Sequence, residues 1–481
     1  VSVYRKSESE LTTFDFKVSN ADIFELPAGP VGFVAGIEWR EESFKDDRDP
    51  RLDGTIQFID DDGDTYPFVS DVVNSSPTPD NQGSRNVSSL FAEFQIPVLE
   101  NLDVQLAARY ENFSDVGNTT VGKAAFGYRP FEPVLLRGSW SQAFRAPNLV
   151  TINEQIVART QTRTDYACLY AAENGGDPEQ DTLDCNYSLQ RIAQGSDELK
   201  PEKSDNTSIG IVVEPLEGLA ITLDYWSIEK KDTIGLLGEE NHSLLDLLYR
   251  LEQGTANCGS ATFNSAVNRG EIDPDEAAFY ENAGICADGQ INYIDDRYAN
   301  LDTRTVSGHD LGIYYTIKSD YGRFKLDYNA SFLDKFEQEA GGLAQQLVQA
   351  QADGILPPNY PVMGFDNLVR RNGNQKEKHS LRMTWRKDAY GASLAAYRIG
   401  SFYQAELTLE DGTRFNIPAM TTFDATVDYT ALIQDVDTRF RLGVKNLTDE
   451  RAPLAATSFG YFNDAHQDYG RYFYLDVRAS F

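Results

Sequence analysis

A transmembrane antiparallel β-barrel with long extracellular loops is the fold class that this 481-residue sequence predicts, and three observations predict it. Apolar and polar residues alternate with a period of two in many segments of about ten residues, the length that a tilted strand needs to cross a bilayer. Short and long connections alternate between these segments, as in outer-membrane barrels. The longest apolar runs are a handful of residues, too short for a membrane-spanning helix. The class is all-β, because a period of two does not form one face of a helix.

The C-terminal segment shows the alternation most clearly. Phe473, Leu475, Val477, Ala479 and Phe481 alternate there with tyrosines, charged residues and a serine. Fourteen earlier segments follow the same pattern, each with apolar residues on one side and polar residues on the other. The predicted strands are about 10–18, 31–44, 88–97, 102–113, 119–128, 133–142, 203–214, 219–231, 303–317, 322–333, 376–386, 390–399, 420–429, 438–446 and 471–481.

Six long connections are predicted to be extracellular loops, and the short turns between them to be periplasmic. The long loops are about 46–87, 143–202, 232–302, 334–375, 400–419 and 447–470, and one brief connection, 114–118, breaks the rule. Residues 1–481 are then part of a single barrel domain. Counting back from a periplasmic C-terminus makes the strand at 10–18 start outside. Because bacterial barrels have even strand numbers, the sequence is expected to be the C-terminal part of a longer protein.

A soluble β-sandwich is the alternative fold, because its strands also alternate apolar and polar residues. Two observations disfavour it. Mixed Arg, Lys, Asp and Glu occupy the polar side of nearly every strand, as a water-filled lumen tolerates. Aromatic residues also gather near predicted strand ends, which is typical of the girdles at membrane interfaces. These residues are Phe144, Tyr225, Trp226, Tyr314, Tyr315, Trp385, Tyr472 and Tyr474.

The charge balance excludes one class of partner. Lys and Arg number 43 against 75 Asp and Glu, a formal net charge of -32, which makes nucleic acid a poor partner. The acidic residues would either attract divalent cations that bridge neighbouring lipopolysaccharide or keep the loops soluble. Outer-membrane lipid is the expected surroundings of the apolar strand faces.

Four cysteines fall into two close pairs, without the C-x-x-C spacing of zinc or redox sites. We expect two local disulfides, Cys168 with Cys185 and Cys258 with Cys286, formed in an oxidising compartment. Both pairs lie in long predicted loops. The disulfides would either hold ligand-capturing loops in shape or protect them from proteases, and the sequence leaves both roles open.

Residues 136–149 (LRGSWSQAFRAPNL) contain an S-x-x-F-R-A-P-x-L run, and residues 199–206 (LKPEKSDN) an L-x-P-E-x-S-x-N run. Both runs resemble motifs of the TonB-dependent outer-membrane receptors of Gram-negative bacteria. Residues 223–229 (LDYWSIE) are similar to the strand that follows, and residues 444–449 (VKNLTD) to the family's V-x-N-L-x-D run. The last strand resembles the Phe-ending signal that the barrel-assembly machinery recognises, although Asp468-Tyr469 stands where the family usually has Asp-Pro.

This resemblance implies a barrel of about 22 strands, of which about 15 are present here. It further implies an N-terminal plug domain and a TonB box, which this sequence lacks, and through them contact with the TonB energy-transducing complex. The barrel-assembly signal would comprise Phe473, Leu475, Val477, Ala479 and Phe481. No cofactor is implied.

Six charged residues are predicted to face the lumen: Asp424, Asp428, Arg439, Arg441, Asp476 and Arg478. They would either line a path and touch the plug, or pair with one another and rigidify the wall. The run 60–64 (DDDGD) invites a calcium site, but it lacks EF-hand spacing, so we favour a solvated acidic loop and predict no metal site.

No enzyme is expected, because nucleophile-elbow, zinc-protease, P-loop and dinucleotide motifs are missing from the sequence. Residues 241–249 have helical spacing of leucines and are expected to pack as a short loop helix over the barrel mouth.

The first hypothesis for function is TonB-dependent uptake of a scarce solute, such as a siderophore, oligosaccharide or peptide, across the outer membrane. The alternatives are a passive porin or an autotransporter-type barrel without energy coupling, and a soluble β-rich adhesin. The missing upstream sequence discriminates the first two. The substrate does not follow from the fold.

Overall fold

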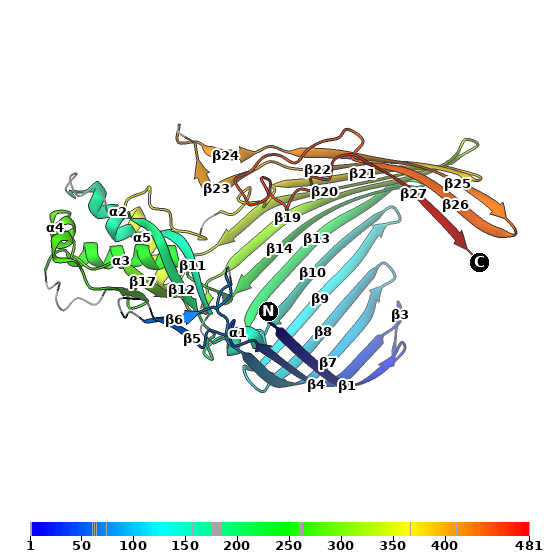
Figure 1. Cartoon of the computed structure of the whole chain (residues 1–481). Helices are drawn as coiled ribbons and strands as arrows, with labels where there is room; N and C mark the ends of the chain where they lie inside the picture. The colour runs from blue at the N-terminus through cyan, green and yellow to red at the C-terminus, as the bar shows by residue number, and fades with distance from the viewer. Residues whose placement is uncertain are drawn as a thin grey trace.

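A single antiparallel sheet of 15 strands dominates the structure, a computed structural model (Figure 1). It describes residues 2–59, 61, 63, 65–73, 75–155, 157–175, 184–256, 258, 263–365, 367–409 and 411–480. Each strand of the sheet pairs with the previous and the next one along the chain, so the topology is an uninterrupted meander. The strands in sheet order are β1 (Arg5–Asn20), β4 (Gly32–Arg48), β7 (Asn81–Leu99), β8 (Leu102–Phe113), β9 (Gly117–Phe131), β10 (Val134–Arg145), β13 (Glu202–Leu216), β14 (Leu219–Lys231), β19 (Arg304–Ser319), β20 (Gly322–Gln338), β21 (Glu377–Lys387), β22 (Tyr390–Ile399), β25 (Met420–Ile433), β26 (Val436–Lys445) and β27 (Tyr472–Ser480).

All fifteen predicted strands are present, and the all-β transmembrane architecture is confirmed. The sheet curves continuously from β1 at one edge to β27 at the other (Figure 1). Because the described parts of β1 and β27 do not pair with each other, this chain forms a curved wall and not a closed ring.

The register keeps one face of the wall apolar throughout. Phe440 lies opposite Val477, and Leu442 opposite Leu475, while Arg441 between them lies opposite Asp476. The apolar side chains of this face, Leu475 among them, are largely exposed in the isolated chain. Exposed apolar side chains on one face and charged ones on the other are what a wall between lipid and a polar lumen requires.

Several predicted loop limits were wrong because the strands continue beyond their apolar segments. For example, β4 continues to Arg48 and β7 already begins at Asn81, so the connection between them is shorter than the predicted loop 46–87. Polar residues such as Arg5 and Arg48 still pair in the ladder there. Backbone pairing needs no apolar side chain, so hydropathy does not mark where it ends.

The assignment of aromatic residues to girdles was partly wrong. Tyr225, Tyr315 and Trp385 share the register positions of the apolar face. Trp226, Tyr314, Tyr472 and Tyr474 alternate with that face and lie on the charged side instead. One consequence is steric, because a side chain at Gly443 would collide with the ring of Tyr474 across the strand pair.

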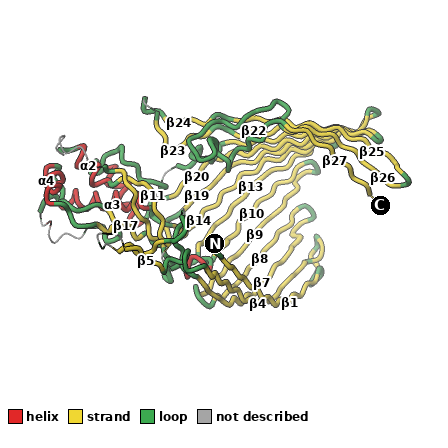
Figure 2. The backbone as a smooth tube through the Cα atoms, viewed as in Figure 1, coloured by secondary structure: helices red, strands yellow, loops and turns green. Residues whose placement is uncertain are grey.

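The long connections carry the remaining elements. One short hairpin lies in the first of them and a short helix at the start of the second, and further elements follow in the others (Figure 2). These elements are β5 (Ile56–Ile59), β6 (Thr65–Val69), α1 (Leu149–Asn153), β11 (Val157–Thr164), α2 (Tyr166–Glu173), β12 (Asn186–Ala193), β15 (Thr233–Gly235), α3 (Glu239–Gln253), β16 (Val267–Arg269), α4 (Pro274–Asn282), β17 (Ile291–Asp295), β18 (Ala299–Leu301), α5 (Gly342–Ala352), β23 (Phe402–Thr408) and β24 (Arg414–Ile417). The turn after β1 holds β2 (Glu25–Leu26) and β3 (Gly29–Pro30).

Three of these connections fold together into what we call the loop unit, residues 146–201, 232–303 and 339–376. It contains the sheet β11-β12-β17-β16 and the helices α2, α3, α4 and α5, which gather beyond one end of the wall (Figure 2). The predicted helix at 241–249 is part of α3, whose leucines Leu244, Leu245 and Leu248 are buried. They contact the other helices of the loop unit in its hydrophobic core, so α3 packs within a folded body and does not lie alone over the mouth.

None of the described helices is long and apolar enough to span a membrane.

Candidate functional site

The charged face of the wall holds the six predicted lumen-facing residues together on β25, β26 and β27. Arg441 lies opposite both Asp428 and Asp476, and Arg439 lies opposite Arg478. Asp428 is buried, with oxygens 3.8 Å from Arg441 Nε and 3.4 Å from Arg386 Nη1. Asp428 is therefore part of an ion-pair network within the wall, as the structural alternative for these residues predicts.

A denser charge network, which the sequence interpretation missed, covers the same face of β4, β7 and β8. Arg40 contacts Glu38 at 3.1 Å and Glu42 at 2.9 Å. Arg85 reaches Glu42 at 3.0 Å, and Arg109 reaches Glu38 at 3.3 Å. The alternation of Glu38, Arg40 and Glu42 along one strand was the available signal, since residues two apart share a face. Shared carboxylates tie three adjacent strands together.

A cavity of about 520 Å³ opens on this face where β22, β25, β26 and β27 meet the last long loop. We call it the last-loop cavity. Its lining combines tyrosines, amides and one charge of each sign. It consists of Tyr397, Ile399, Met420, Thr422, Asp424, Lys445, Asn446, Ala465, Gln467, Tyr469, Gly470 and Tyr472. Of the six predicted lumen-facing residues, only Asp424 lines it.

A second cavity of about 660 Å³ adjoins the first, because Tyr397 and Ile399 line both. It extends across β19, β20 and β21 and includes the ion pair of Arg137 with Asp224, whose closest atoms are 2.6 Å apart. The two cavities form a polar track along the inner wall, and its outer end lies under the last loop.

The last loop, residues 446–471, is held against the β23–β24 hairpin. The side-chain amide of Gln404 donates to Ala456 O at 2.8 Å and accepts from Ala456 N at 3.0 Å. His466 stacks on Phe402 with centroids 5.6 Å apart, and Phe462 meets Phe402 edge-on. His466 is buried, and within the described chain neither ring nitrogen has a hydrogen-bond partner. Burial lowers the pKa of this imidazole below its ordinary value of 6.5.

The loop unit is organised around a buried charge network. Arg269 donates two hydrogen bonds to Asp165, at 2.7 and 2.9 Å, and another to Asp246 at 2.9 Å. Arg250 also reaches Asp246, at 3.0 Å, and donates to the Cys286 carbonyl at 2.8 Å. Burial opposes ionisation of Asp165, but the Arg269 guanidinium outweighs it and lowers the pKa of that carboxyl. The same contacts keep the pKa of Arg269 well above its usual range, against the effect of burial.

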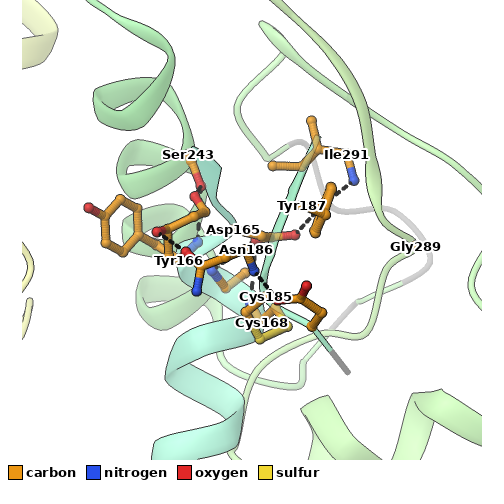
Figure 3. The surroundings of a disulfide bond; sticks show 12 residues. Asp165, Tyr166, Cys168, Cys185, Asn186, Tyr187, Ser243, Gly289 and Ile291 are labelled. Atoms are coloured by element: carbon orange, nitrogen blue, oxygen red, sulfur yellow. Dashed lines mark hydrogen bonds between the residues drawn. A yellow bond between two sulfur atoms is a disulfide. The ribbon is translucent and has the colours of Figure 1, made fainter. Parts of the chain in front are cut away.

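Both predicted disulfides are present, Cys168 with Cys185 and Cys258 with Cys286. The first lies beside Asp165, one member of the charge network (Figure 3). Asp165 caps α2 by accepting from the amides of Ala167 and Cys168, and it accepts from the Tyr187 hydroxyl at 3.0 Å. The disulfide therefore links the start of α2 to the strand that carries Tyr187, and the carboxylate of Asp165 sits between them.

No group of three His, Cys, Asp or Glu side chains in the described ranges is arranged to hold a metal ion. Asp60, Asp62 and Asp64 of the acidic run at 60–64 lie outside the described residues. Phe481, the last residue of the predicted assembly signal, also lies outside them. The other four signal residues alternate along β27, and Phe473, Leu475 and Val477 are exposed on the apolar face.

A wall of long antiparallel strands, apolar outside and charged inside, with large folded loops at one end, defines the chain as part of a large transmembrane β-barrel. The chain belongs to the TonB-dependent receptors, because residues 3–447 match the family described as "TonB dependent receptor-like, beta-barrel". Barrels of this family are outer-membrane proteins of Gram-negative bacteria, and the family comprises receptors and transporters.

Solved structures of such receptors share the fold. The siderophore receptor PirA from Acinetobacter baumannii matches with a TM-score of 0.60 at 18% identity, over 99% of this chain and 55% of that one. A mutant of the ferric enterobactin receptor PfeA from Pseudomonas aeruginosa matches with a TM-score of 0.60 at 17% identity, over 99% and 54%. This chain therefore spans about half the length of these receptors. No curated protein matches the sequence.

Proposed function

We propose that the protein to which this chain belongs imports a scarce solute across the outer membrane of a Gram-negative bacterium by TonB-dependent transport. The observation that carries the proposal is the family match over residues 3–447, on a wall whose charged inner face carries a continuous polar track. A porin or autotransporter-type barrel also fits the alternation of the strands, but the family match favours the receptor.

Each part of the chain has a distinct role in this proposal. The disulfide-bonded loop unit and the last loop capture the solute outside, and the polar track gives it a path. The apolar face contacts lipid and, at the outer surface, lipopolysaccharide. The final strand, with Phe473, Leu475, Val477, Ala479 and Phe481, is recognised by the barrel-assembly machinery. A plug and a TonB box receive energy from the TonB complex.

The test is uptake by the native strain, a deletion strain and a complemented strain, offered a panel of radiolabelled ferric chelates, oligosaccharides and peptides. Ferric chelates belong in the panel because the similar solved receptors are named for siderophores. We expect one solute class to enter only with the gene present, and to stop entering when TonB is deleted or the proton-motive force is collapsed. Uptake that persists without TonB would favour a passive pore and contradict the proposal.

A further inference from the structure

We propose that the last-loop cavity binds a neutral, polyhydroxylated ligand of the saccharide class. This deepens the proposed function by naming the substrate class, and it rests on that function.

Three tyrosines from three separate segments present their rings to the cavity. Tyr397 comes from β22, Tyr472 from β27 and Tyr469 from the last loop. They are 37%, 42% and 79% exposed, so all three rings have surface to offer a ligand. The carbon-bound hydrogens of a sugar ring form an apolar face that packs on an aromatic ring, while the tyrosine hydroxyls stay available to water or hydroxyl groups. Arg382 donates to the Tyr397 hydroxyl at 3.1 Å and so holds one ring in place.

The polar groups of the cavity suit hydroxyl groups. Asp424 accepts a hydrogen bond from the backbone N–H of Asn446 at 3.0 Å through Oδ1, and its Oδ2 has no hydrogen-bond partner in the described part of the chain. A carboxylate oxygen accepts from a hydroxyl, the Gln467 amide both donates and accepts, and the Thr422 hydroxyl does the same. A few convergent polar groups among apolar surfaces are typical of sites for small polar ligands.

The charge of the cavity disfavours an anionic chelate. Its lining contains one carboxylate, Asp424, and one ammonium group, Lys445, whose nitrogen lies 5.8 Å from the centroid of the Tyr472 ring. Recognition of a multiply charged anion calls for several cations, above all arginines that bind two oxygens at once. No arginine lines this cavity. A ferric tris-catecholate, which carries three negative charges, would find a single counter-charge that Asp424 already offsets.

The acidic loop unit, at the same end of the wall as the last loop, adds to this selectivity. Residues 232–303 contain 14 Asp and Glu but only three Arg and no Lys. An excess of one sign around an opening slows the approach of ligands of the same sign and leaves neutral ones unaffected. Neutral sugars therefore meet no electrostatic barrier at the mouth, and anions do.

The outer wall of the cavity is held in place before a ligand arrives. Asp468, next to Tyr469, forms a two-point ion pair with Arg451 at 2.8 and 2.5 Å. Together with the contacts of Gln404 and Phe402 to the last loop, this fixes the segment that carries Gln467 and Tyr469. A preformed site loses less conformational entropy on binding.

The test uses the purified full-length receptor in detergent. The probes are a panel of neutral trisaccharides built from glucose, xylose, mannose, galactose and N-acetylglucosamine, together with a ferric tris-catecholate, and calorimetry measures their binding. The variants are Tyr469→Ala and Asp424→Asn. The matched control is Tyr321→Ala, because Tyr321 is as exposed as Tyr469 (77% against 79%) but lies in the short turn between β19 and β20, at the opposite end of the wall.

We expect at least one trisaccharide to bind, with an affinity about tenfold weaker in Tyr469→Ala and in Asp424→Asn and unchanged in Tyr321→Ala. The inference is overturned if no trisaccharide of the panel binds, if binding is insensitive to both cavity variants, or if the ferric tris-catecholate binds and is the ligand that those variants weaken. TonB-dependent import of a ferric chelate would overturn this inference while supporting the proposed function. Saccharide entry that does not need TonB would contradict the proposed function while supporting this inference.

Discussion

Arg269 holds Asp165 by two hydrogen bonds of 2.7 and 2.9 Å, although 104 residues separate them along the chain. Asp165 belongs to the connection between β10 and β13, and Arg269 to the connection between β14 and β19. The pair is buried, so it joins two of the long connections through the interior of the loop unit. Neither loop completes this core alone.

Replacement of Arg269 by methionine is expected to destabilise the loop unit strongly. Removing the guanidinium leaves Asp165 buried without its counter-charge and leaves Asp246 paired with Arg250 alone, and an unpaired buried charge costs about 3 to 5 kcal/mol. The measurement is hydrogen exchange of the β16 and β17 amides in the full-length receptor. Arg297→Ala is the control, since Arg297 forms a comparable 2.9 Å pair with Asp295 at the surface, where such pairs contribute about 0 to 1 kcal/mol. Equal effects of the two substitutions would contradict the role of burial.

Loss of the disulfides is expected to loosen the loop unit and spare the wall. The bonded cysteines are 17 and 28 residues apart, and closing loops of this size stabilises a fold by about 3 to 4 kcal/mol in the chain-entropy model. In the Cys168→Ser/Cys185→Ser variant, proteolysis should cut the connection between β10 and β13 first, while the heat-resistant mobility of the barrel on gels stays unchanged. A barrel that fails to assemble would show that the disulfide acts earlier, during folding.

Docking of the last loop is expected to weaken below neutral pH. Burial lowers the pKa of His466, so the undocked loop binds a proton that the docked loop does not. Docking is therefore fully stable above about pH 6.5 and loses stability as the pH falls from there toward the lowered pKa. Hydrogen exchange of residues 447–470, corrected for intrinsic rates, should increase between pH 7.5 and 5.5. His466→Phe keeps a ring against Phe402 and should abolish this dependence, and persistence of the dependence in that variant would rule out His466 as its source.

The two faces of β27 are expected to respond differently to charge. Leu475→Arg places a cation in lipid, at a cost of about 2 to 4 kcal/mol near the bilayer midplane. Asp476→Asn, one residue further on the charged face, removes a charge from the lumen side and should be tolerated. The amount of assembled receptor in the outer membrane is the readout. Similar losses in both variants would mean that the assignment of faces from the register is wrong.

Sequence reasoning located the wall but not the loop unit, and the difference has a physical cause. A strand such as Leu102–Phe113 shows its period directly, because neighbouring residues in the chain lie on opposite faces. The sheet β11-β12-β17-β16 has strands of three to eight residues drawn from two loops, and β12 pairs in parallel with the distant β17. Such short strands carry too few residues for a period to be visible. The remaining signal for Arg250 and Arg269 was that residues 232–303 contain only three arginines among 14 acidic residues, so each arginine has several carboxylates to pair with.

The candidate site was predictable only in part for a similar reason. Alternation predicted that Asp424 and five other charged residues face the lumen. Of these six, only Asp424 lines the last-loop cavity. Tyr397, Tyr469 and Tyr472 converge on it from segments far apart in the sequence. Tyr472 was assigned to a membrane girdle, because a tyrosine near a strand end fits either face until the register is known.

The sequence by itself determined the all-β class, the fifteen strands of the wall, their two faces and the pairing of the cysteines, since each of these depends on residues close together in the chain. Tertiary structure alone decided which loops fold together, that Arg269 pairs with Asp165 and which tyrosines surround a cavity. Those contacts join residues separated by long loops. A periodic pattern carries no information about such contacts, because the geometry that creates them arises only when the wall has brought the ends of its strands together.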